Sequence, residues 1–138
     1  SRRLRIIRDG RSFINMRTVL LVEDNENNRY LFTLLLTHAG FKVLTAVNGR
    51  EGLEKARADK PDAILLDIQM GEMDGYEVAE HLKVDPVLAS IPIIGVSSFA
   101  MPGDRSRALS AGFAGYIEKP VDPEFFAATV QQLLHEAK

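Results

Sequence analysis

The sequence has no cysteine among its 138 residues and only three histidines. Without cysteine the chain has no disulfide bridges, no thiol catalysis and none of the usual structural zinc sites. Long hydrophobic stretches are also missing. No apolar run approaches the roughly 18 residues of a membrane span, and no signal-like apolar block follows the basic start. We therefore expect a cytoplasmic protein that makes no use of the membrane.

The composition suits one folded domain with an unevenly placed charge. A length of 138 residues fits a single domain, and 46% hydrophobic residues supply a core. Residues 1–16 contain five arginines and one aspartate, a charge of +4, so in a chain of net charge −2 the remainder carries −6. An acidic body is a poor match for the phosphates of nucleic acid, and we expect no direct DNA binding.

The basic start sets the expected domain boundary. We predict that residues 1–16 are a basic N-terminal arm: a disordered tail, a linker to another domain or an added remnant. Contact of this arm with nucleic acid or an anionic membrane is the alternative. Residues 17–138 are predicted to form the domain itself.

From residue 18 onward, short apolar runs alternate with segments of helical spacing. The predicted strands are residues 18–22, 41–46, 63–66, 91–96 and 114–117. The predicted helices are residues 25–39, 50–58, 75–83, 102–111 and 123–136. On the first helix, Tyr30, Leu31, Leu34, Leu35 and His38 recur at helical spacing. Five strands alternating with five helices are typical of an α/β domain with a doubly wound parallel sheet.

Three carboxylates follow strands that this fold can bring together. Glu23 and Asp24 follow the first strand, and Asp67 follows the third. Ligands of open α/β sheets bind beyond the carboxyl ends of the strands, and the strand order 2-1-3-4-5 would make these two strands neighbours. Clustered carboxylates raise one another's pKa and favour a cation, and oxygen ligands without histidine or cysteine favour Mg²⁺. The alternative is that each acid is solvated or caps a helix.

A hydroxyl and an ammonium are predicted at the same edge of the sheet. Ser97 follows the fourth strand and Lys119 follows the fifth. A phosphoryl group on Asp67 would need such donors to hold its oxygens. The bond from Lys119 to Pro120 is one that can be cis. Each of the two residues alone is more simply explained as an ordinary surface or strand-end side chain.

Four segments in a fixed order resemble a known family. They are VLLVEDNENNR from Val19, the run from Asp67 to Gly75, PIIGVSS before Phe99 and YIEKP at Tyr116–Pro120. Over residues 18–137 the chain resembles a bacterial two-component response-regulator receiver domain of the single-domain, CheY-like type. The resemblance implies a flavodoxin-like (βα)5 fold with strand order 2-1-3-4-5.

The resemblance also implies a function, that of a phosphoacceptor switch rather than an enzyme. Asp67 would accept a phosphoryl group from the phosphohistidine of a sensor histidine kinase or a histidine phosphotransfer protein, and slow self-dephosphorylation would follow. Lys119 would pair with the phosphate and Ser97 would hydrogen-bond it. Tyr116 would be the switch aromatic that responds to Ser97.

A magnesium site is implied by the same resemblance. Asp24, Asp67 and the backbone carbonyl of Gln69 would ligate Mg²⁺, and Glu23 would reach it through water. The three histidines, His38, His81 and His135, lie on separate predicted helices without the spacing of metal ligands, and we expect structural or surface roles for them.

Some positions depart from the family pattern and leave alternatives open. Gly71 stands where receivers usually have proline, and Gln69 and Phe99 occupy the two variable positions beside the site. A Mg²⁺-dependent phosphohydrolase would share the acids and the lysine, but it should have a general acid two residues after the nucleophile, where Gln69 stands. A receiver module taken from a hybrid histidine kinase is the other alternative.

The output is expected at the surface of the fourth helix, fifth strand and fifth helix. Phe99–Pro102 is an apolar stretch that suits a docking patch for a downstream protein. Ala114-Gly115 replaces the Asp-Asp pair that many DNA-binding receivers carry before the tyrosine, and the chain ends on the fifth helix. Both features argue against a built-in DNA-binding output.

Overall fold

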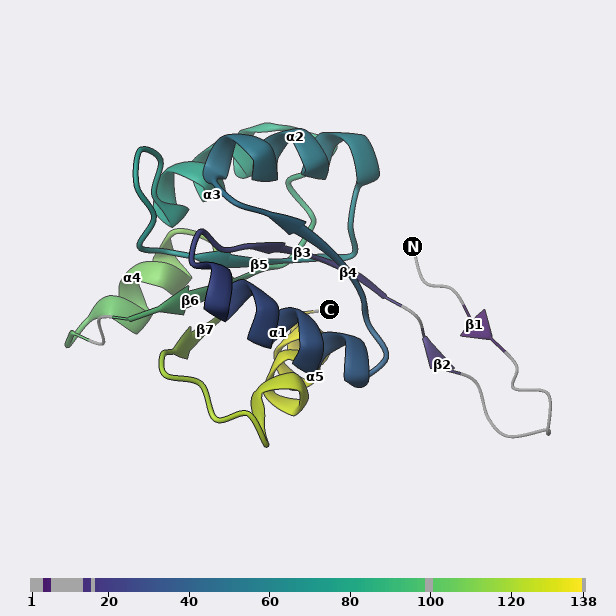
Figure 1. Cartoon of the computed structure of the whole chain (residues 1–138). Helices are drawn as coiled ribbons and strands as arrows, with labels where there is room; N and C mark the ends of the chain where they lie inside the picture. Colours follow the sequence, from purple (N-terminus) through teal and green to yellow (C-terminus); the bar gives the residue numbers. More distant parts are fainter. Residues whose placement is uncertain (1–3, 6–13, 16, 99–100, 138) are drawn as a thin grey trace.

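The computed structural model describes residues 4–5, 14–15, 17–98 and 101–137 of the chain. Its main sheet has five parallel strands in the order β4-β3-β5-β6-β7, which is the predicted order 2-1-3-4-5 (Figure 1). The strands are β3 (Thr18–Val22), β4 (Lys42–Ala46), β5 (Ala63–Asp67), β6 (Ile93–Ser97) and β7 (Gly115–Glu118). The predicted doubly wound α/β fold is thereby confirmed.

Five helices join the strands of this sheet. They are α1 (Glu26–His38), α2 (Gly49–Asp59), α3 (Gly75–Val84), α4 (Asp104–Ser110) and α5 (Phe126–Glu136). Figure 1 shows α2 and α3 on one face of the sheet and α1 and α5 on the other. Of the helices in the described part of the chain, none is long and apolar enough to cross a membrane.

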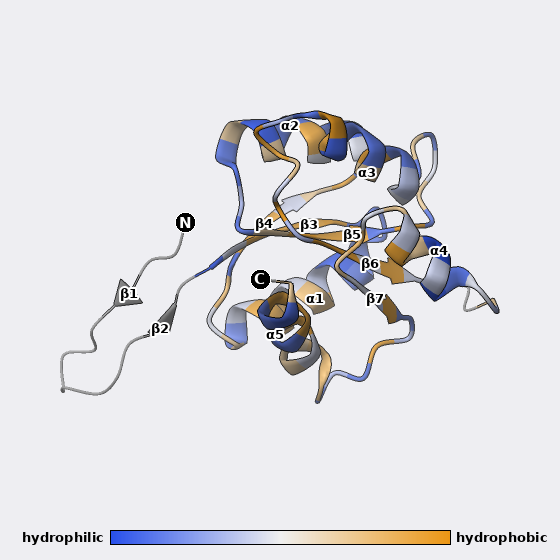
Figure 2. Cartoon of the chain, turned by 180° about the vertical axis from the view of Figure 1, so that it is seen from behind, coloured by the Kyte–Doolittle hydropathy of each residue, from blue (hydrophilic) through white to orange (hydrophobic). Residues whose placement is uncertain are grey.

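The strands are continuously apolar because helices cover both faces of the sheet. In β3, Leu20 and Val22 belong to the core under α2 and α3, whereas Val19 and Leu21 belong to the core under α1 and α5. Successive strand residues point to opposite faces, so both sets are buried. Each fully buried side chain of this kind contributes roughly 1.5–3 kcal/mol. Figure 2 shows the resulting hydrophobic colour along the strands.

Side-chain caps set the starts of three helices. Asn25 and Asn48 accept hydrogen bonds from backbone amides at the starts of α1 and α2, and Asp74 forms a reciprocal capping box with Glu77 in α3. These caps place α1, α2 and α3 directly after the loops at the carboxyl ends of β3, β4 and β5. The side chains at those strand ends therefore lie between a strand that precedes them and a capped helix that follows them.

Two predicted helix starts were too early. The prediction placed Pro123 in the first turn of the last helix, but α5 begins at Phe126 and residues 123–125 form a turn. Likewise α4 begins at Asp104 and not at residue 102, because Gly103 has φ 93°, outside the helical range. The fourth strand also starts two residues later than predicted, at Ile93.

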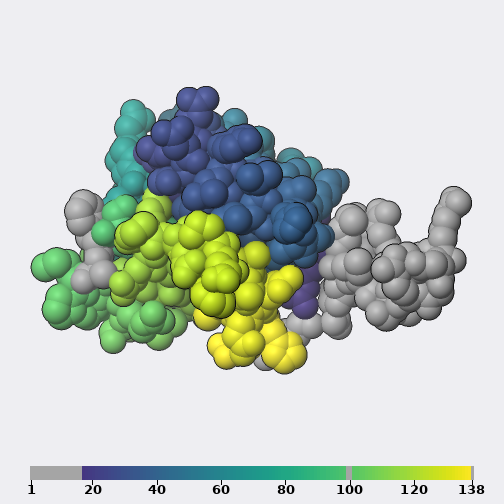
Figure 3. All heavy atoms as spheres, turned by 60° about the horizontal axis from the view of Figure 1, so that its bottom comes forward, coloured from purple at the N-terminus to yellow at the C-terminus, as the bar shows by residue number. Residues whose placement is uncertain are grey.

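The buried residues of α1 are not among those named for their helical spacing. Phe32 and Leu36 are buried, and the Phe32 ring stacks on Phe126 of α5 with centroids 4.9 Å apart. Tyr30 is instead 71% exposed, and Leu34 is also exposed. Helix α1 has apolar residues on more than one face, so spacing alone did not identify the face that meets α5. Figure 3 shows the blue atoms of α1 against the yellow-green atoms of α5.

A short strand pair was not predicted. Within residues 1–16, β1 (Leu4–Arg5) and β2 (Ile14–Asn15) pair antiparallel, as a sheet separate from the main one. Strands of two residues are too short for a periodic sequence signal. The domain boundary at residue 17 stays a prediction.

Candidate functional site

The carboxyl ends of β3 and β5 bring three acids together. Val22, the last residue of β3, pairs with Leu66, so Glu23 and Asp24 leave β3 beside Asp67, the last residue of β5. One carboxylate oxygen from each acid lies within 4.8 Å of the other two. The structure therefore has the acidic cluster that the sequence predicted.

Lys119 lies between the two buried acids of this cluster. Glu23 is 1% exposed and Asp67 is 3% exposed. The Lys119 Nζ atom lies 3.0 Å from Glu23 Oε1 and 3.4 Å from Asp67 Oδ2. Glu23 Oε2 accepts a hydrogen bond from the Asn25 amide at 3.1 Å. The single positive charge of Lys119 therefore lies between two carboxylates, and it neutralises only one of their two negative charges.

That imbalance changes the protonation of Asp67. Burial and the neighbouring charge of Glu23 raise the pKa of Asp67 from 3.8 to about 7, although the Lys119 ammonium lowers it in part. Without a further cation, Asp67 holds a proton for part of the time near neutral pH. A cation at the cluster would favour the ionised, nucleophilic form.

The donor set fits a hard divalent cation. Oxygen atoms supply the whole cluster, and the buried Glu23 Oε1 has the Lys119 ammonium beside it but no well-directed hydrogen bond from a described residue. Asp24 is the exposed member of the three, so the cluster is open to solvent on that side. Oxygen ligands of this kind suit Mg²⁺.

The donors from β6 and β7 lie next to the acids. Ser97 is the last residue of β6 and is buried, and its carbonyl accepts a 2.7 Å hydrogen bond from the Lys119 amide. The Lys119–Pro120 peptide bond is cis. Since β5 pairs with β6, Asp67 is opposite Val96 and one position from Ser97. Every side chain that the sequence placed at this edge is thus at the carboxyl end of a strand.

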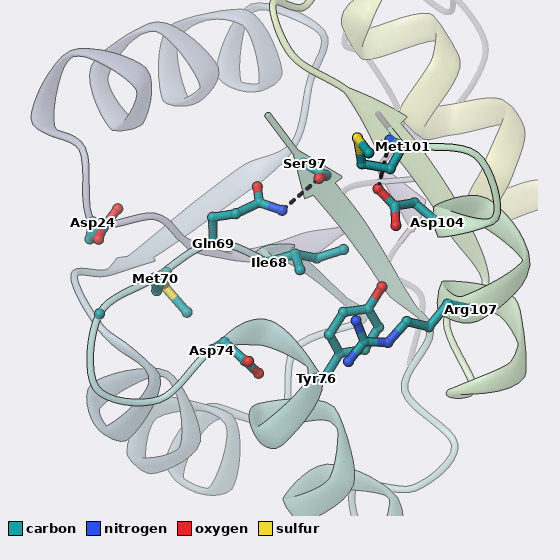
Figure 4. A pocket seen from close by; sticks show the side chains of 11 residues that line it. Asp24, Ile68, Gln69, Met70, Asp74, Tyr76, Ser97, Met101, Asp104 and Arg107 are labelled. Carbon is teal, nitrogen blue, oxygen red and sulfur yellow. Dashed lines mark hydrogen bonds between the residues drawn. The ribbon is translucent and has the colours of Figure 1, made fainter. Parts of the chain in front are cut away.

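Gln69 connects the two sides of the edge. Its amide N–H donates to Asp67 Oδ1 at 3.2 Å. Its side-chain Nε2 donates to Ser97 Oγ at 2.7 Å (Figure 4). Its Oε1 accepts from the Ser98 amide at 2.7 Å. The sequence analysis named Gln69 for its backbone carbonyl and did not foresee these side-chain bonds.

A hollow of about 560 Å³ extends from the cluster toward α4. Asp24, Gln69 and Ser97 line one part, and Tyr76 and Arg107 line the part toward α3 and α4. Figure 4 shows the Arg107 guanidinium over the Tyr76 ring, with its carbon 4.0 Å from the ring centroid. No sequence motif pointed to this stack, because the two residues are far apart in the chain.

The predicted switch aromatic lies inside the molecule. Tyr116 is 3% exposed and packs in the core that includes Phe113, and the Arg105 guanidinium carbon is 5.6 Å from the centroid of its ring. Of the predicted docking stretch, Phe99 and Ala100 lie outside the described residues. Met101 is 65% exposed.

One further contact was missed by the sequence analysis. Arg29 on α1 donates a 2.9 Å hydrogen bond from its guanidinium to the Glu23 carbonyl. It lies in the same VLLVEDNENNR segment that carries the acids, but the motif gave no reason to expect this bond. The three histidines lie on α1, α3 and α5, as expected.

Taken with the fold, this edge defines a class of protein: a flavodoxin-like (βα)5 domain with an acidic, lysine-bearing site at the carboxyl ends of its strands. A family model for the response regulator receiver domain matches residues 19–131. The chain therefore belongs to the response regulator receiver family.

Similar proteins agree with this assignment. The chain is 42% identical to the polar-differentiation response regulator DivK of Brucella anthropi over 121 residues, 88% of this chain and 98% of that protein. DivK of Brucella melitensis is 41% identical over the same shares.

Among solved structures, the Vibrio cholerae chemotaxis protein CheY4 has a TM-score of 0.80 at 30% identity, covering 86% of this chain and 98% of that one. A receiver domain of a Syntrophus aciditrophicus histidine kinase has a TM-score of 0.77 at 33% identity, covering 88% and 92%. The chain is thus a phosphoacceptor of two-component signalling.

Proposed function

We propose that Asp67 is the residue that accepts the phosphoryl group. The observation that carries this proposal is the central position of β5 in the sheet. On one side, β3 brings Glu23 and Asp24, and on the other, β6 brings Ser97. Asp67 is therefore flanked by groups suited to a cation on one side and by a hydrogen-bonding group on the other.

The proposed donor is a phosphohistidine of a sensor histidine kinase or of a histidine phosphotransfer protein. A carboxylate oxygen of Asp67 forms a bond to phosphorus while the phosphorus–nitrogen bond breaks and its electron pair returns to the imidazole. Lys119 pairs with the transferred oxygens and the Ser97 hydroxyl donates to them. Mg²⁺, held by Asp24, Asp67 and the Gln69 carbonyl with Glu23 through water, would offset the charge of those oxygens.

We also propose that the protein does not turn over free phosphorylated substrates. The residue two places after Asp67 is Gln69, and a carboxamide cannot serve as a general acid. Its side chain is engaged with Ser97 and Ser98. Slow self-dephosphorylation is the only hydrolysis that we expect.

The proposed output surface is formed by α4, β7 and α5. Exposed apolar side chains support this assignment, with Met101 and Leu109 at α4 and Phe125 just before α5. We propose that a downstream protein binds here, more tightly once Asp67 is phosphorylated, and that no DNA is bound. Comparing amide chemical shifts with and without beryllofluoride, a phosphoryl mimic, tests this. Shifts confined to residues around Asp67, with Tyr116 and residues 101–111 unmoved, would contradict it.

Labelling with acetyl phosphate and Mg²⁺ tests the acceptor. We expect one phosphoryl group per parent chain, none for Asp67→Asn and full labelling for Asp59→Asn, which changes an exposed aspartate at the end of α2. Persistent labelling of Asp67→Asn would overturn the assignment. Sustained release of phosphate without labelled protein would instead indicate a phosphohydrolase.

A further inference from the structure

Gln69 makes three hydrogen bonds that link the acceptor to the end of the neighbouring strand. Its backbone N–H donates to Asp67 Oδ1 and its Nε2 donates to Ser97 Oγ. Its Oε1 accepts a hydrogen bond from the Ser98 amide. The backbone bond ties the residue to the loop after β5. The side-chain bonds tie the same residue to the end of β6.

The orientation of the carboxamide follows from chemistry. A backbone N–H can only donate, so the side-chain atom that faces the Ser98 amide must be the oxygen. The other end of the planar amide is then the NH₂ group, which donates to Ser97 Oγ. A hydroxyl oxygen that accepts at this position must direct its own hydrogen elsewhere. The Gln69 side chain therefore makes Ser97 Oγ a hydrogen-bond acceptor on the side facing Gln69, with the hydroxyl hydrogen directed away from it.

The described residues between Ser97 and the end of α4 are mostly exposed. Ser98 is exposed, and of the seven residues of α4 the structure buries Ala108 alone. Gly103, before that helix, supplies no side-chain cap. The Gln69 carboxamide thus holds the point where a buried strand passes into an exposed connection.

We propose that Gln69 is a positioning residue of the phosphoacceptor site. Its carboxamide holds Ser97 in place, with the hydroxyl as a donor, before a phosphoryl group arrives on Asp67. The inference rests on the proposed acceptor role of Asp67. It adds that the response of Ser97 to the phosphoryl group depends on a residue two places after the acceptor, through its side chain and not its carbonyl.

A double-mutant cycle on beryllofluoride affinity, measured with Mg²⁺, tests the proposal. Gln69→Met keeps the length of the side chain and removes both side-chain hydrogen bonds. We expect it to weaken binding about fivefold, which corresponds to about 1 kcal/mol. In the Ser97→Ala background the same change should have less than about a twofold effect, because the hydroxyl that Gln69 holds is gone. Gln132→Met, which removes an exposed amide on α5 that bonds Glu136, should behave as the parent.

A second readout needs neither metal nor phosphoryl group. The Ser98 amide should exchange its hydrogen about tenfold faster in metal-free Gln69→Met than in the parent, whereas Gln132→Met should leave it unchanged. Parent protein that fails to bind beryllofluoride through Asp67 would refute the proposed function itself. If the parent binds, two results would overturn only the positioning role: equal weakening in both Ser97 backgrounds, or unchanged affinity and exchange.

Discussion

The edge of the sheet that carries the site has two unlike halves. The acid half, at the ends of β3 and β5, rises from strands in which every residue except Thr18 is buried. The switch half, at the ends of β6 and β7 with α4, has a buried strand in β6, but β7 ends in exposed Glu118 and α4 buries one residue. The same edge thus joins a fully buried support to a partly exposed one.

Within the switch half, α4 packs in the core through Ala108 and also makes two cation–π contacts. Arg107 stacks on Tyr76 of α3, and Arg105 lies over Tyr116 of β7. Contacts of this kind contribute roughly 0.5–1 kcal/mol at exposed sites. The difference teaches that the acids lie at the ends of fully buried strands, whereas α4 buries little of its own surface and depends in part on these two contacts.

The largest expected effect is on the free energy of unfolding, and it comes from the buried carboxylate charge of Asp67 in the acid half. Because the pKa of Asp67 is raised from 3.8 to about 7, the native state binds this proton more tightly than the unfolded state does. The free energy of unfolding then falls as pH rises between those values. Asp67→Asn cannot ionise, so at pH 8 without metal we expect it to be about 2–4 kcal/mol more stable than the parent.

Urea unfolding in the presence of a chelator measures this gain. The difference between Asp67→Asn and the parent should shrink toward zero below about pH 4. The matched variant Asp59→Asn should stay within about 0.5 kcal/mol of the parent throughout. Finding Asp67→Asn no more stable than the parent at pH 8 would contradict this expectation. A difference in stability that is the same at pH 8 and below pH 4 would also contradict it, because ionisation of Asp67 would then not destabilise the native state.

A smaller effect is expected from the exposed member of the acid half. Asp24→Ala removes a proposed direct ligand, so Mg²⁺ affinity should fall tenfold or more, about 1.4 kcal/mol for each decade. The fold should survive, because loss of one carboxylate relieves repulsion in the metal-free cluster. Titration with Mg²⁺ gives the affinities, and Asp59→Ala serves as control. Identical curves for Asp24→Ala and the parent would refute the ligand role.

The smallest effect is expected in the switch half. Arg107→Met removes the cation–π contact with Tyr76, about 0.5–1 kcal/mol. Amide hydrogens of α4 should then exchange two- to fivefold faster by an order-of-magnitude estimate, while those of β5 stay unchanged. Arg57→Met, on α2, is the control. Equal acceleration in α4 and β5 would mean that the two halves are not separately held.

The sequence predicted the acids at the strand ends but not the contacts between segments that are distant in the chain. Asp67 and Glu23 were placed correctly because a short buried strand followed by an acid is a local signal. The pairing of Arg107 on α4 with Tyr76 on α3, and of Gln69 with Ser97 of β6, depends on how separate segments meet in space and leaves no periodic trace in the sequence. The early start predicted for α5 came from Pro123, since proline suits a first helical turn but also a turn before one.

Chemical trapping of the acceptor tests the central claim most directly. Borohydride reduces an aspartyl phosphate to homoserine, so the phosphorylated residue can be identified by mass spectrometry of peptides. After incubation with acetyl phosphate and Mg²⁺, homoserine should be found at residue 67 alone, and Asp67→Asn should yield none. Homoserine at Asp24, or labelled protein without homoserine at residue 67, would contradict the account.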